Sequence, residues 1–133
     1  MKKLILFMVF TSISLAGCKT FEQSLIEKGY RNLHGDELTK TFVGNTDFTS
    51  SGEYWYYGED GRIVGISKSG RDIDGKWTLN DAGTICIDWD DVYLPSGCSK
   101  YFINDQTKEI VWLEPDGQNS KTDIKKGNPK NFK

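Results

Sequence analysis

The chain offers few side chains for acid–base catalysis, because only one of its 133 residues is a histidine, His34. A catalytic triad or a histidine general base would have to use this residue. It stands just before a predicted helix, where a histidine ordinarily faces solvent or caps the helix. Residues 65–70 lack the order of a phosphate-binding loop and that of a nucleophile elbow. The sequence therefore predicts a protein that is not an enzyme and carries no cofactor.

Three carboxylates gather beside Trp89, namely Asp88, Asp90 and Asp91. Such a group can bind calcium, which takes about 6–8 oxygen ligands. The spacing of an EF-hand loop is missing, however, because Asp88 is not followed by the D-x-D-x-D-G order. Paired carboxylates also carry out sugar hydrolysis, but closeness in sequence does not set the separation that this reaction needs. We expect a solvated loop between two strands and no metal site.

The first residues have the parts of a secretory signal. Met1 and two lysines precede an almost wholly apolar run at 4–15, and the small residues Ala16 and Gly17 follow. A positive start, an apolar stretch of about 7–15 residues and a small-residue exit are typical of export signals. The run is shorter than the roughly 20 apolar residues of a membrane span. Residues 1–17 are therefore predicted to be a signal peptide.

The residues Leu15-Ala16-Gly17-Cys18 resemble the lipobox of bacterial lipoproteins. The resemblance implies cleavage before Cys18 and acylation of that cysteine, palmitate included. Two or more acyl chains hold a protein stably at a membrane, where one chain does not. Lys19 follows where an inner-membrane retention signal has aspartate, which points to the outer membrane, facing the periplasm. The expected location is thus the bacterial cell envelope, with the membrane as a partner through the lipid anchor.

Cys86 and Cys98 remain once Cys18 is assigned to the anchor. In an oxidising compartment, two remaining cysteines predict a disulfide, here across a β-hairpin. A metal site is disfavoured because these cysteines and His34 form no short-spaced pair. A redox role is disfavoured because there is no C-x-x-C motif.

Aromatic residues recur along the predicted strands and could line a ligand cavity or fill the interior of a small barrel. They are Trp55, Tyr57, Trp77, Trp89, Tyr101 and Trp112. We favour a filled interior, because four tryptophans occupy much volume in a chain of this size. Tyr54 and Tyr56 alternate with Trp55 and Tyr57, so one pair must face outward. Tyr54, Tyr56 and Trp89 are therefore the candidate binding surface.

One or two short helices are expected first. Residues 20–29 are predicted to form a short helix or, alternatively, a tether that keeps the domain clear of the lipid surface, and a second short helix is predicted at 36–43. Asp36 is expected to cap the second helix and Gly44 to stop it. Short runs rich in aromatic and β-branched residues then alternate with Asp-Gly and Asn-rich turns. The predicted strands are residues 52–58, 62–67, 75–79, 84–89, 98–103 and 109–113. A further strand is predicted at 122–126, and the alternative is a loose basic end, since five lysines fall between Lys121 and Lys133.

These elements predict a mainly β fold, an antiparallel meander of about seven or eight short strands that is small and barrel-like. The short connections leave no room for crossover helices, which is why the sheet is expected to be antiparallel. Alternation places Ile85, Ile87 and Trp89 toward the core, and both strand cysteines on the less buried face. The predicted organisation is a signal peptide at 1–17, a lipid-anchored linker with a short helix at 18–35, a β domain at 36–126 and a polar tail at 127–133.

Three short motifs follow one another in the segment 36–102: Gly75-Lys76-Trp77, Cys86-Ile87-Asp88-Trp89 and Gly97-Cys98. With these motifs the segment resembles an uncharacterised family of small exported proteobacterial proteins. The resemblance implies a compact β domain with a bridge between Cys86 and Cys98. It implies no activity.

The balance of basic and acidic residues argues against nucleic acid as a partner. The chain has 17 basic and 19 acidic residues, and two of the lysines lie in the export segment. A protein this acidic lacks the basic face of a nucleic-acid binder. We therefore expect a non-catalytic envelope lipoprotein with a binding or structural role, and an envelope protein as its partner. The alternatives are a periplasmic inhibitor of lysozyme type and a small-ligand carrier of lipocalin type.

Overall fold

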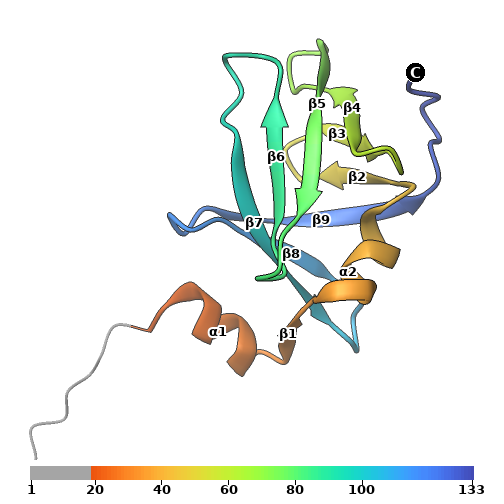
Figure 1. Cartoon of the computed structure of the whole chain (residues 1–133). Coiled ribbons are helices and arrows are strands. Elements are labelled where there is room, and N and C mark those ends of the chain that lie inside the picture. The colour runs from red at the N-terminus through yellow and green to blue at the C-terminus, as the bar shows by residue number, and fades with distance from the viewer. Residues whose placement is uncertain (1–18) are drawn as a thin grey trace, which may run out of the picture.

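The computed structural model describes residues 19–133 (Figure 1). The predicted signal peptide at 1–17 and the predicted lipidation site Cys18 lie outside the described residues. The elements of the described part, in chain order, are α1 (Phe21–Glu27), β1 (Tyr30–Asn32), α2 (Gly35–Phe42), β2 (Asn45–Thr49), β3 (Tyr54–Tyr57), β4 (Arg62–Ile66), β5 (Asp72–Leu79), β6 (Ile85–Trp89), β7 (Gly97–Asn104), β8 (Ile110–Leu113) and β9 (Asn119–Lys126).

The strands β2 to β9 form a closed, antiparallel, up-and-down barrel. Each strand pairs with its neighbour in sequence, and β9 pairs back onto β2 over five residue positions, from Asn45↔Lys126 to Thr49↔Thr122. Closure leaves no unpaired sheet edge among these strands. The predicted antiparallel, barrel-like meander with two short helices before it is confirmed.

Two strands were not predicted. Strand β2 has the sequence Asn45-Thr46-Asp47-Phe48-Thr49, and Asn and Asp are depleted in strands, so it resembles a turn. Strand β1 has only three residues and pairs with the far end of β7, outside the closed barrel. Because β1 pairs with β7, the β domain begins before residue 36, the boundary that the sequence predicted.

Helix α1 packs on the outer face of the barrel. Its capping box joins Thr20 and Gln23, and Gly29 follows the helix with φ +85°. Leu25 is buried against outward-facing side chains of β7 and β8, including Phe102 and Val111. The helix is thus part of the folded domain, and not a spacer that holds the domain away from the anchor.

Helix α2 closes one end of the barrel, because its Leu38 and Phe42 are buried in the same cluster as the inward-facing strand residues. Leu33, just before the helix, belongs to this cluster too. The expectation that Asp36 caps this helix is wrong. His34 occupies the N-cap position and makes no side-chain capping bond, and Asp36 lies in the first turn. A carboxylate in the first turn is still favoured there by the helix dipole.

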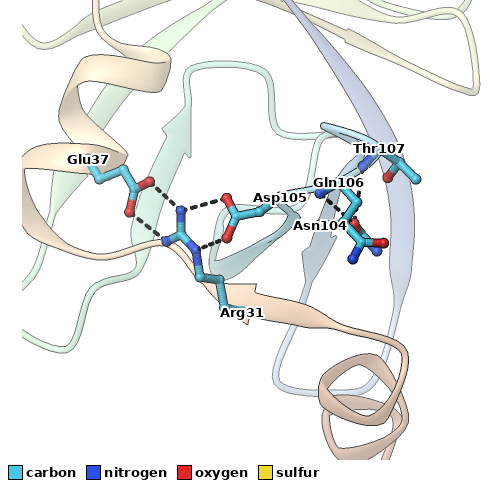
Figure 2. A network of polar contacts seen from close by, with 6 residues as sticks. All are labelled: Arg31, Glu37, Asn104, Asp105, Gln106 and Thr107. Carbon is cyan, nitrogen blue, oxygen red and sulfur yellow. Dashed lines mark hydrogen bonds and ion pairs between the residues drawn. The ribbon is translucent and has the colours of Figure 1, made fainter.

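An arginine fastens α2 to the barrel, as Figure 2 shows. The Arg31 guanidinium, on β1, donates to both carboxylate oxygens of Glu37 at 2.6 and 2.7 Å. It also donates to both oxygens of Asp105, in the turn after β7, at 2.5 and 3.0 Å. These bonds hold the pKa values of Glu37 and Asp105 below their usual range. The network links β1, α2 and the β7–β8 turn at the closed end.

The C-terminal segment is folded back onto the barrel and is not a loose end. Strand β9 forms, and the ring of Phe132 lies 5.8 Å from that of Tyr54. Lys130 lies over the same tyrosine ring, 5.1 Å from its centroid.

No helix within residues 19–133 has the length and apolar character needed to cross a membrane.

Candidate functional site

The end of the barrel opposite α2, here called the mouth, holds a small cavity of about 90 Å³. Figure 1 shows the β6–β7 loop of this end at the top of the molecule and α2 at the lower right. The cavity is lined mainly by aromatic and small residues: Trp55, Ile87, Trp89, Pro95, Gly97, Ser99, Tyr101, Trp112 and Glu114.

The period of the strands brings these residues together. Side chains of a strand alternate between its two faces, so every second residue points into the barrel. Ile87 and Trp89 of β6 therefore share the interior with Ser99 and Tyr101 of β7. The register places Tyr101 directly opposite Trp112 of β8.

Two tryptophans of the cavity lining, Trp55 and Trp89, are in edge-to-face contact. The ring centroids of Trp55 and Trp89 are 5.5 Å apart, and the ring planes make an angle of 69°. The indole N–H of Trp55 donates to the hydroxyl of Tyr57 at 3.1 Å, and this hydroxyl lies 3.4 Å from that of Tyr101. These contacts with the Tyr57 hydroxyl hold the side chains of Trp55 and Tyr101 in their orientations.

A carboxyl group, that of Asp47, is buried deeper inside the barrel. Asp47 is 1% exposed and accepts a hydrogen bond from the Thr122 hydroxyl, but its Oδ2 atom has no partner. Burial, and to a smaller extent the charge of Asp123, raises the pKa of Asp47 well above its usual range. Burial likewise raises the pKa of Tyr101, and Asp47 adds to that shift. The barrel interior therefore favours the neutral form of Asp47.

Replacing Asp47 with asparagine is expected to stabilise the protein increasingly as the pH rises. In the unfolded chain Asp47 loses its proton at about pH 4. In the folded chain it stays protonated up to a higher pH, because its pKa is raised. The folded state then binds more protons, so the contribution of Asp47 to stability falls as the pH rises between the two pKa values.

Asparagine has the same shape and no charge at any pH. At pH 8 the variant is therefore expected to gain about 1–3 kcal/mol in free energy of unfolding, and at pH 4 much less. Urea titrations at the two pH values measure this difference. Equal gains at both would show that Asp47 keeps an ordinary pKa.

The rim of the mouth carries the one charged side chain of the cavity lining, Glu114. It is half-buried and forms no ion pair with any other residue in the range 19–133. Burial is the main cause that raises the pKa of the Glu114 carboxyl, and nearby Asp116 adds to it.

The loop between β6 and β7 forms another part of the rim, since Pro95 and Gly97 line the cavity. This loop exposes two large apolar side chains: Val92 is 88% exposed and Tyr93 is 82% exposed. The disulfide between Cys86 and Cys98 joins the two strands at its base, where these residues face each other in the register. The rim therefore exposes apolar side chains on a loop whose two ends are linked by the disulfide.

The three residues of the candidate binding surface do not form one surface. Tyr54 and Tyr56 point outward from β3, and Tyr54 is partly covered by Phe48 and Phe132. Trp89 instead packs against the interior and lines the mouth. Only Trp89 of the three belongs to the cavity.

The remaining candidates for chemistry, His34 and the aspartates beside Trp89, do not form a site. His34 is exposed at the start of α2. Asp91 pairs with Arg71 at 3.0 Å, and Asp88 accepts a hydrogen bond from Ser96 at 3.0 Å. Within residues 19–133, no three His, Cys, Asp or Glu side chains gather in a way that could hold a metal ion.

Sequence reasoning missed Glu114, Asp47 and the exposed pair Val92 and Tyr93. The available signals were weak. Glu114 precedes Pro115 in a turn, Asp47 lies in a strand that resembles a turn, and Val92 and Tyr93 are the apolar residues of an otherwise polar loop.

A larger hollow of about 410 Å³ lies on the outer surface between α1 and the β8–β9 turn. Its charged residues Glu22 and Lys100 already pair with each other at 3.0 Å. Glu114 borders both hollows. The mouth is the better candidate, because its one carboxylate has no cationic partner within the described chain and its walls are aromatic.

Comparisons of the chain with protein-family models, with curated proteins and with solved structures find no match.

Proposed function

We propose that this protein is a non-catalytic lipoprotein of the cell envelope, anchored through Cys18, that binds a partner at the mouth of its barrel. The aromatic cavity with the exposed loop beside it is the observation that carries the proposal. Large exposed apolar residues next to a concave aromatic site are typical of binding surfaces.

The size of the cavity indicates what the mouth can hold. Pockets for complete small-molecule ligands have volumes of roughly 300–1,000 Å³. The mouth cavity has about 90 Å³, and the rest of the interior is filled by side chains such as Tyr57, Phe42 and Ile63. A carrier of lipocalin type is therefore disfavoured. The mouth fits a small protruding group of a larger partner, with Val92 and Tyr93 in contact around it.

Site-specific photo-crosslinking in living cells tests this proposal. The lipidated chain would carry a photo-reactive amino acid at position 93, on the rim. The matched control carries it at position 81, in the exposed β5–β6 turn, whose Gly83 lies beside His34 at the closed end. We expect a dominant crosslinked species from position 93 that is absent from position 81. Equal crosslinking patterns at the two positions would contradict the proposal.

A protein inhibitor, for instance of lysozymes, is the second candidate. The observation in its favour is the exposed β6–β7 loop, which is held at its base by a disulfide and can enter a partner's cleft. Purified protein would then inhibit a lysozyme at micromolar concentration, and Tyr93→Ala would weaken the inhibition. Full lysozyme activity at that concentration excludes this candidate.

A further inference from the structure

We infer that the group held in the barrel mouth is a compact organic cation, such as a quaternary ammonium or a protonated amine. This inference rests on the proposed function and names the ligand class of the same site. It follows from the aromatic walls, the carboxylate at the rim and the size of the cavity.

The aromatic walls are the first observation. Trp55, Trp89, Trp112 and Tyr101 surround the cavity from four different strands. Aromatic faces attract cations through the ring quadrupole, tryptophan most strongly, and aromatic cages are a recurring way to bind quaternary ammonium groups. Trp55 and Trp89 are in edge-to-face contact, with their ring planes at 69°, and both border the cavity.

The charge of the lining is the second observation. Glu114 is the only residue of the lining with a formal charge at neutral pH, and no lysine or arginine lines the cavity. Partial burial disfavours the charged form of this carboxylate, and a bound cation would favour it. An anionic ligand would meet this carboxylate as a like charge, so the site selects against anions.

The space available is the third observation. Gly97 is exposed, and a Cβ atom there would have no heavy atom within 4 Å, so the cavity opens to solvent at this point of the mouth. A cavity of about 90 Å³ suits a small head group and not a complete sugar or nucleotide.

Binding of choline to the full, lipidated chain in a non-ionic detergent tests the inference. The matched neutral probe is 3,3-dimethylbutan-1-ol, which has the shape of choline without its charge. Tryptophan fluorescence reports occupancy, at constant ionic strength set with sodium chloride. We expect saturable binding of choline, with the neutral probe about tenfold weaker. Choline binding should also weaken as the pH is lowered through the pKa of Glu114, since choline keeps its charge.

The variant Glu114→Gln should weaken choline binding about tenfold and leave the neutral probe unchanged. Glu59→Gln is the matched control, because Glu59 is exposed beside Gly44 at the closed end. Near-UV circular dichroism checks that both variants are folded.

Equal binding of the two probes would overturn the cation inference and leave the mouth as an apolar site. Binding of neither probe would also overturn it, whereas crosslinking at position 93 decides the proposed function separately.

Discussion

Replacing Phe42 with alanine is expected to lower the free energy of unfolding by about 3–5 kcal/mol. Phe42 is the last residue of α2 and is 1% exposed. Its ring centroid lies 5.4 Å from that of Tyr57 and 4.4 Å from that of Tyr101, so it connects the helix to two strands inside the barrel. Truncation would remove these contacts and leave a cavity at the closed end, which neighbouring rings cannot fill without moving.

Urea titration followed by tryptophan fluorescence measures this loss. Lys40→Ala is the matched control, because Lys40 is exposed on the same helix. It is expected to change the free energy of unfolding by less than about 0.5 kcal/mol. A loss below about 1 kcal/mol in the Phe42 variant would contradict the role of α2 as the closure of the barrel.

Removing the disulfide, by Cys86→Ala together with Cys98→Ala, is the second large effect expected. The bridge joins residues 12 positions apart in sequence, and loops of about this length stabilise a fold by about 3 kcal/mol in the chain-entropy model. Both cysteines are only half-buried, so the loss would come from the missing cross-link more than from lost packing.

Thermal unfolding with and without a reductant measures this effect. Reduction should lower the melting temperature of the wild type toward that of the double variant and leave the double variant unchanged. Thiol-reactive labelling of the native chain should modify neither cysteine. Labelling at either position, or a melting temperature insensitive to reduction, would contradict the bridge.

The barrel could be anticipated from the sequence where local signals were strong. Asp-Gly and Asn-rich turns separate most of the strands, and alternation in residues 85–89 placed Ile85, Ile87 and Trp89 toward the interior, as observed. The disulfide followed from two cysteines left over in an expected oxidising compartment. These features depend on residues close together in the chain, which is why pattern and period suffice.

The mouth could not be predicted in the same way. It is built from side chains of β3, β6, β7 and β8, and their meeting depends on closure of the barrel by β2 and β9. Strand β2 contains Asn45 and Asp47, which disfavour strands locally, so its formation reflects pairing with β3 and β9. Trp89 was expected both as a core residue and as a surface residue, and the cavity makes it an inner wall of the open end.

Filling the mouth tests the account most directly. Gly97→Leu would place an apolar side chain at the opening of the cavity, on the face of β7 that carries Ser99 and Tyr101. The substitution causes no backbone strain, because Gly97 does not have a positive φ and has room for a Cβ atom. The substitution leaves the rest of the rim, Val92 included, unchanged. Photo-crosslinking from position 93 in the lipidated chain is then compared between the Gly97→Leu variant and the parent. We predict that the dominant crosslinked species is lost in the variant while its expression and melting temperature stay close to those of the parent. The same species at undiminished yield would show that the partner binds without using the mouth, and would contradict the account.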